Sequence, residues 1–162
     1  MIIYFSGTGN TEYVAKRLAQ ATGDALLDLR GRLQQEDYSA ISGEHRIVLV
    51  TPTYAWRIPR IVEEWLQKTP LPDADSIWFV MTCGGEIGNA AKYNIRLAEA
   101  KGLRYMGTAQ ILMPDNYIVM FNAPDAAKSK EIVDAAEPDI EAVGKLLTEG
   151  AEFGKPRYVC PR

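Results

Sequence analysis

Residues 6–11, SGTGNT, combine two glycines, three hydroxyls and one amide without a single charge. They stand between an apolar run at 2–5 and a helical pattern at 11–21. The start of a helix presents unpaired N–H groups and the positive end of its dipole, and glycines let several N–H groups point inward. We therefore predict a neutral phosphate cradle formed by Ser6, Gly7, Thr8, Gly9, Asn10 and Thr11. A plain helix turn capped by Thr11 would need only one hydroxyl.

Three other phosphate motifs fit this stretch less well. A P-loop needs Gly-Lys followed by Ser or Thr, but the first lysine is Lys16. A dinucleotide fingerprint needs a third glycine, and Glu12 occupies that position. Asp28 does lie about 20 residues further on, where a ribose-binding acid belongs, so this alternative stays open. A tyrosine-phosphatase loop would need a cysteine and an arginine, which residues 6–11 lack.

Two further loops follow apolar strands and carry residues suited to a planar ligand. The first contains two aromatic side chains, and an aromatic face can stack on a flat ring. The second is rich in glycine, which leaves backbone N–H groups available for the polar edge of such a ring. The candidates in the two loops are Pro52, Thr53, Tyr54, Ala55, Trp56, Thr82, Cys83, Gly84, Gly85 and Gly88.

The elements that must position these loops alternate along the chain. Apolar patterns predict strands at 2–5, 25–29, 47–50, 77–81 and 107–113, and helical patterns predict helices at 11–21, 59–66, 89–100 and 126–148. This alternation indicates an α/β fold, a doubly wound five-stranded parallel sheet with helices on both faces. In the strand order 2-1-3-4-5, the loops after strands one, three and four would line one crevice.

The remaining segments are predicted to be irregular or interrupted. Residues 30–45 are polar and are expected to form a loop, and Pro138 is expected to kink or split the last helix. We place one domain at 1–150 and an irregular C-terminal tail at 151–162.

Composition narrows the functional classes. The 162 residues carry a net charge of -3 and 47% hydrophobic residues, which fits a globular protein and argues against a general nucleic-acid binder. Cys83 and Cys160 are the two cysteines, too few for a disulfide framework or a metal cluster. The N-terminal run has no basic region and no apolar stretch is long enough to span a bilayer, so we expect a cytoplasmic protein without a membrane partner.

The segment YFSGTGNTEYVAKRLA resembles the phosphate loop and first helix of flavodoxins, which bind flavin mononucleotide (FMN). The segments TPTYAWRIPRIVEEWL and CGGEIGNAAKYNIRLAEAKGL are similar to later loops in the flavodoxin half of flavodoxin–ferredoxin fusion proteins, and MPDNY at 113–117 recurs there. The resemblance covers the chain to about residue 150. Unlike the fusion proteins, this chain has only Cys160 in its tail, so an iron–sulfur cluster cannot be built from it.

The resemblance implies a flavodoxin-like fold and roles for individual residues. Tyr54 would cover one face of the flavin ring, with Trp56 as a second candidate. Flavodoxins often carry another aromatic near the position of Gly88, and Tyr117 is the residue here that could replace it.

Two departures from the flavodoxin pattern concern the loop after strand three. Flavodoxins usually place a glycine after the aromatic, and this chain has Ala55, whose Cβ disfavours positive φ and would hinder a rearrangement of that peptide. Arg57 follows closely. If its guanidinium faced the cofactor, it would stabilise negative charge on the reduced ring.

The sequence thus favours an FMN-binding, flavodoxin-like electron-transfer protein over a turnover enzyme. Its expected partners are redox proteins of the ferredoxin or reductase type, with the chain itself a monomer and nucleic acid excluded. Two alternatives remain: an FMN-dependent NAD(P)H/quinone-type reductase on the same fold, and a flavin-free regulatory module that binds an anion at residues 6–11.

Overall fold

The computed structural model describes residues 1–114 and 126–154. Five strands form one parallel sheet in the order β2-β1-β3-β4-β5, which confirms the predicted topology. The elements along the described chain are β1 Ile2–Tyr4, α1 Asn10–Thr22, β2 Leu26–Asp28, α2 Leu29–Gln34, β3 Arg46–Pro52, α3 Arg60–Lys68, β4 Ser76–Cys83, α4 Ala90–Ala100, β5 Arg104–Leu112 and α5 Ala126–Thr148.

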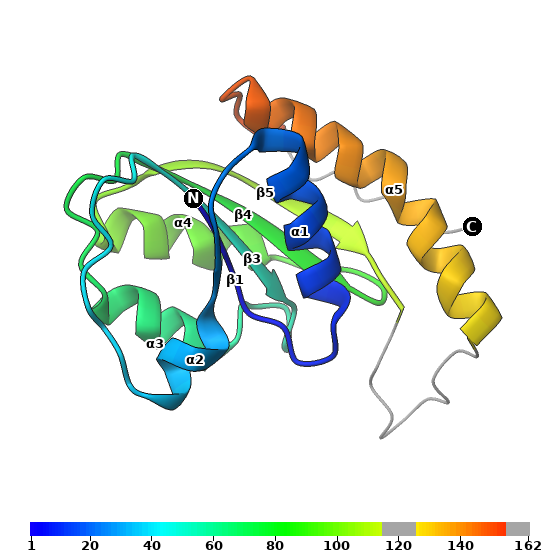
Figure 1. Cartoon of the computed structure of the whole chain (residues 1–162), viewed down its shortest axis with the longest axis horizontal. Coiled ribbons are helices and arrows are strands. Elements are labelled where there is room, and N and C mark those ends of the chain that lie inside the picture. The colour runs from blue at the N-terminus through cyan, green and yellow to red at the C-terminus, as the bar shows by residue number, and fades with distance from the viewer. Residues whose placement is uncertain (115–125, 155–162) are drawn as a thin grey trace.

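Helices cover both faces of the sheet, as Figure 1 shows, with α1 and α5 over one face and α3 and α4 over the other. The alternation within β3 explains this arrangement. Ile47 and Leu49 belong to the apolar core beneath α3 and α4, whereas Val48 and Val50 belong to the core beneath α1 and α5. Because side chains of a strand point alternately to opposite faces, a strand buried on both sides must be apolar throughout.

Two local predictions differ from the structure, namely the loop over residues 30–34 and the splitting of the last helix at Pro138. Residues 29–34 form the short helix α2, where the end of a strand and the start of the loop at 30–45 were expected. Asp28 caps this helix by accepting a hydrogen bond from Arg30 N at 2.9 Å, and Leu29 is fully buried. Helix α5 runs unbroken through Pro138. Buried residues on both sides of the proline, Ala136 and Ile140 among them, hold the helix on the sheet despite the missing N–H donor.

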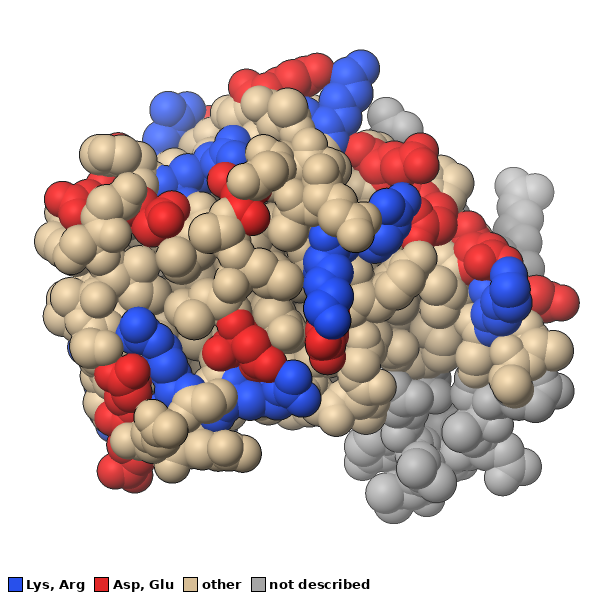
Figure 2. All heavy atoms as spheres, viewed as in Figure 1, with Lys and Arg blue, Asp and Glu red and all other residues tan. Residues whose placement is uncertain are grey.

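The surface of this fold carries mixed charges. Figure 2 shows Lys and Arg interspersed with Asp and Glu on the face that includes α1 and α5. One ion pair between such side chains joins the two helices, because Arg17 on α1 lies 2.7 Å from Glu137 on α5. Among the residues that the structure describes, no helix is both long and apolar enough to cross a membrane.

Candidate functional site

A cavity of about 530 Å³ opens at the carboxyl ends of β1, β3 and β4, within the usual size range of small-molecule sites. Its walls come from all three predicted loops, which lie together as the strand order requires. The residues that line it are Gly7, Thr8, Asn10, Thr11, Pro52, Thr53, Tyr54, Ala55, Thr82, Cys83, Gly84, Met113 and Pro114. None of these residues carries a charge, so any anion bound here must be held by neutral donors and by backbone dipoles.

The first loop leads into α1 without a side-chain cap. Gly9 occupies the N-cap position with φ of 101°, and no side-chain hydrogen bond caps it. The hydroxyl of Ser6 is buried and accepts a hydrogen bond from Gly9 N at 3.1 Å, so it braces the loop from inside. Thr11 lies inside the helix, not at its cap. The first turn of α1 therefore presents uncapped N–H groups to the cavity, which suits an anion.

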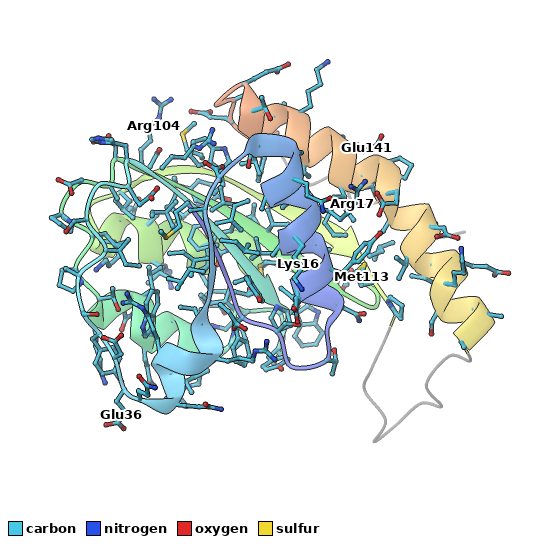
Figure 3. All side chains as sticks on the ribbon, in the orientation of Figure 1. Lys16, Arg17, Glu36, Arg104, Met113 and Glu141 are labelled. Atoms are coloured by element: carbon cyan, nitrogen blue, oxygen red, sulfur yellow. The ribbon has the colours of Figure 1, made fainter. Side chains whose placement is uncertain are left out.

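Two side chains of the first helical turn bind elements that are distant in sequence. The hydroxyls of Thr11 and Thr82 lie 2.8 Å apart and join α1 to the end of β4. The amide of Asn10 donates to the carbonyl of Pro114 at 2.8 Å, which ties the loop to the chain that leaves β5. Figure 3 shows Met113 in the same region, beside the start of α1. Asn10 and Thr11 thus line the cavity while also holding its walls together.

The loop after β3 contains a tight turn with unusual backbone angles. Tyr54 and Arg57 form an isolated antiparallel bridge, with N–O distances of 2.8 and 3.1 Å. Between them, Ala55 has φ of 48° and Trp56 has φ of 58°. Two consecutive positive φ values are typical of a type I′ turn, which normally holds asparagine and glycine. The Cβ atoms of Ala55 and Trp56 make this conformation strained, and such strain concentrates at functional sites.

The two aromatic residues of this turn point to different places. Tyr54 lines the cavity and is 53% exposed, and its hydroxyl lies within van der Waals reach of Gly7, 3.5 Å from the position a Cβ would take there. Trp56 instead packs on Gly88, where a Cβ would lie only 2.4 Å from the indole Cδ1. Among the described residues, Tyr54 is therefore the aromatic side chain that lines the cavity, whereas Trp56 joins the second loop to the third.

The structure thus separates the predicted site residues into two groups. Most of them line the cavity. Those placed outside its lining are Ser6, Gly9, Trp56, Gly85 and Gly88, and Tyr117 lies outside the described residues. The sequence reasoning missed Met113 and Pro114 as lining residues, although both belong to a stretch, MPDNY, that it had singled out.

Two charged residues that the sequence analysis considered as ligand contacts interact with other side chains outside the cavity. The guanidinium of Arg57 lies 4.2 Å from the centre of the Tyr93 ring and 3.5 Å from Glu63, and Arg57 does not line the cavity. Asp28 caps α2 and lies 2.6 Å from the guanidinium of Arg30, which lowers the pKa of that carboxyl. Asp28 also does not line the cavity, so the dinucleotide alternative loses its ribose-binding acid.

A comparison with known protein families agrees with the fold described above. The model of the flavodoxin domain family matches residues 1–104, nearly two thirds of the chain. The chain belongs to the flavodoxin domain family. No curated protein is significantly similar to the sequence.

Solved structures show the flavodoxin-like fold at low sequence identity. An FMN-dependent NADH-azoreductase from Bacillus anthracis, solved in complex with FMN, is 11% identical with a TM-score of 0.54, over 91% of this chain and 98% of that one. A WrbA-like flavodoxin from Agrobacterium tumefaciens is 15% identical with a TM-score of 0.52, over 91% and 96%. A flavo di-iron protein from Thermotoga maritima is 14% identical with a TM-score of 0.57, over 92% of this chain and 35% of that one.

Proposed function

We propose that this flavodoxin-domain protein binds FMN in the 530 Å³ cavity and carries electrons between redox proteins. The observation that carries the proposal is the neutral, uncapped start of α1 opening into the same cavity as Tyr54. A phosphate monoester would fit the uncapped N–H groups in the first turn of α1, and a flat aromatic ring would fit beside the tyrosine. When bound, FMN supplies the isoalloxazine ring that accepts and gives up electrons.

The chain's own residues would bind and orient this cofactor. The first turn of α1 holds the phosphate with N–H groups and the Thr8 hydroxyl, and Tyr54 excludes water from one face of the ring. The backbone of residues 82–85 contributes N–H groups to the polar edge of the ring. The described lining residues include no lysine or arginine to neutralise the phosphate, so the cradle relies on several hydrogen bonds made together.

The exposed rim of the cavity supports transfer to a partner protein. Tyr54 and Trp56 are 53% and 57% exposed, although aromatic side chains are normally well buried. Exposed aromatic residues next to a cofactor site suit a small, transient interface of the kind that redox partners form. We propose a ferredoxin-type protein or a reductase as the partner, with the chain acting as a cytoplasmic monomer and binding neither nucleic acid nor membranes.

A second candidate function is favoured by the position of Trp56. Because this indole packs on Gly88, Tyr54 is the one aromatic residue in the described part of the cavity lining. In this second proposal, one face of a bound ring stays open to a small acceptor. An FMN-dependent NAD(P)H/quinone-type reductase would use that face. The first turn of α1 and Tyr54 would hold the flavin, which would supply two-electron chemistry between a nicotinamide and a quinone.

The decisive test is retention of flavin by the purified chain. The protein is mixed with FMN, freed of excess flavin by gel filtration and examined by visible absorption, with riboflavin and inorganic phosphate as comparison ligands. Bound FMN with weaker binding of riboflavin supports the proposal, whereas no retained flavin refutes both flavin-dependent functions. Stabilisation by phosphate alone would then favour the flavin-free regulatory module.

The same preparation distinguishes the carrier from the reductase. Rapid oxidation of NADH or NADPH with a soluble quinone would identify the reductase. Slow turnover with both nucleotides, together with rapid reduction by a ferredoxin-type protein or a flavodoxin reductase, would identify the carrier.

A further inference from the structure

The loop after β4, residues 84–88, is the third of the three loops around the site. A glutamine side chain that the sequence analysis did not identify is hydrogen-bonded to its backbone. Gln110 lies on β5, on the same face of the sheet as Thr108, whose hydroxyl bonds Asn94 of α4 at 3.0 Å. Gln110 is half-buried, and its side chain reaches the loop at the carboxyl end of the sheet.

The amide of Gln110 makes two hydrogen bonds of opposite direction. Its Oε1 accepts from Ile87 N at 3.2 Å, and its Nε2 donates to the carbonyl of Gly85 at 3.3 Å. Only a primary amide of this length can accept from one backbone group and donate to the other. Glutamate could make the first bond but not the second, and methionine, whose sulfur is only a weak acceptor, could not make the second bond and could replace the first only poorly.

The loop needs these two hydrogen bonds because its own glycine-rich sequence does not define one conformation. Gly84 and Gly85 are exposed, and glycine loses more backbone entropy on ordering than any other residue. Ile87 is fully buried in the core and anchors the far end of the loop. Between these points, the two bonds from Gln110 fix the orientation of the peptide groups that follow the cavity-lining residues Cys83 and Gly84.

We infer that Gln110 is a positioning residue for the part of the site that holds the flavin ring, an inference that rests on the proposed FMN function. Gln110 does not itself line the cavity. It acts through the backbone of residues 84–87, and so it contributes to binding of the ring but not of the phosphate. The phosphate group is held instead by the first turn of α1.

The test compares riboflavin with FMN, because riboflavin carries the ring without the phosphate. In Gln110→Met, the affinities for both ligands are expected to fall by the same factor, about tenfold for two lost hydrogen bonds. In Thr8→Ala, by contrast, FMN affinity falls and riboflavin affinity stays. Gln34→Met, on the exposed surface of α2, is the matched control and should change neither affinity.

Two further measurements separate positioning from a general loss of structure. The flavin-free Gln110→Met protein should still unfold cooperatively, within about 3–6 °C of the wild type. Gln110→Glu, which keeps one bond, should lose less riboflavin affinity. Hydrogen bonds to the electron-rich reduced ring are stronger than those to the oxidised ring. A reduced-state affinity that falls tenfold further than the oxidised-state affinity would make the midpoint potential of the Gln110→Met protein about 30 mV more negative.

The outcomes are distinct. Equal losses for riboflavin and FMN, with cooperative thermal unfolding, support the inference. If the wild type binds both ligands and Gln110→Met binds them equally well, the inference is overturned while the FMN function stands. A loss confined to FMN also overturns it, because the effect would then act through the phosphate. A wild type that binds neither ligand overturns the FMN function and the inference with it.

Discussion

Replacing Ala55 by glycine is expected to stabilise this protein, although glycine usually destabilises. Ala55 has φ of 48°, in the left-handed region, where a Cβ costs about 1–2 kcal/mol. Glycine removes that cost but loses about 0.5–1 kcal/mol more backbone entropy on folding than alanine. The difference leaves a net stabilisation of about 0.5–1 kcal/mol. For a chain of 162 residues this raises the melting temperature by roughly 1–4 °C.

The measurement is equilibrium unfolding in urea of the flavin-free protein, with an alanine in ordinary helical conformation as the control. Ala142 is exposed in the interior of α5, so Ala142→Gly should lower the free energy of unfolding by about 1 kcal/mol. The same chemical change is thus expected to have opposite signs at the two positions. If Ala55→Gly destabilises as much as Ala142→Gly, the turn at 54–57 is not strained at Ala55 and the reasoning fails.

Three more predictions concern the surroundings of the site. Gly88→Ala should lower the free energy of unfolding by about 2 kcal/mol, because the added Cβ would lie 2.4 Å from the Trp56 indole. In a Trp56→Ala background the same change should cost only about 1 kcal/mol, and a double-mutant cycle in urea measures the difference. Arg17 lowers the pKa of Glu137 from its ordinary 4.5, so Glu137→Gln should reduce thermal stability at pH 7. This difference should shrink as the pH falls below the ordinary 4.5 and through the lowered pKa, and a difference that stays constant over that titration would contradict the reasoning. Arg57→Gln should change FMN affinity, followed by flavin fluorescence, by less than about twofold, since Arg57 lies outside the cavity lining; a tenfold loss would place Arg57 at the cofactor.

The fold and the location of the site could be predicted because both depend on short-range patterns. Continuous apolar runs such as 47–50 identify strands buried on both faces, and parallel strands place their following loops at one end of the sheet. Residues 6–11 were informative for the same reason, since glycines and hydroxyls between a strand and a helix leave N–H groups exposed. These inferences need no knowledge of which side chains meet in space.

The orientation of individual side chains could not be predicted, because it depends on contacts between distant residues. Asn10 bonds Pro114, which is 104 positions away, and nothing in residues 6–11 indicates this. The Ser6 hydroxyl accepts a hydrogen bond from Gly9 N, a contact that the residue types do not indicate. Helix α2 escaped detection because Gly31 interrupts a pattern whose apolar positions are only Leu29 and Leu33.

Side-chain contacts hold the loop after β3 and the loop after β4 together, and these contacts explain how the strained turn at 54–57 persists. A turn with positive φ at Ala55 and Trp56 would relax to an ordinary conformation if its side chains were unrestrained. Trp56 is restrained because its indole packs on Gly88, and Gly88 follows Ile87, which is buried and bonded to Gln110. The same contacts that order the third loop therefore hold the turn that places Tyr54 in the cavity. Loosening either loop should disturb both walls of the site, and the start of α1 is joined to the end of β4, which leads into the third loop, through the Thr11–Thr82 hydrogen bond.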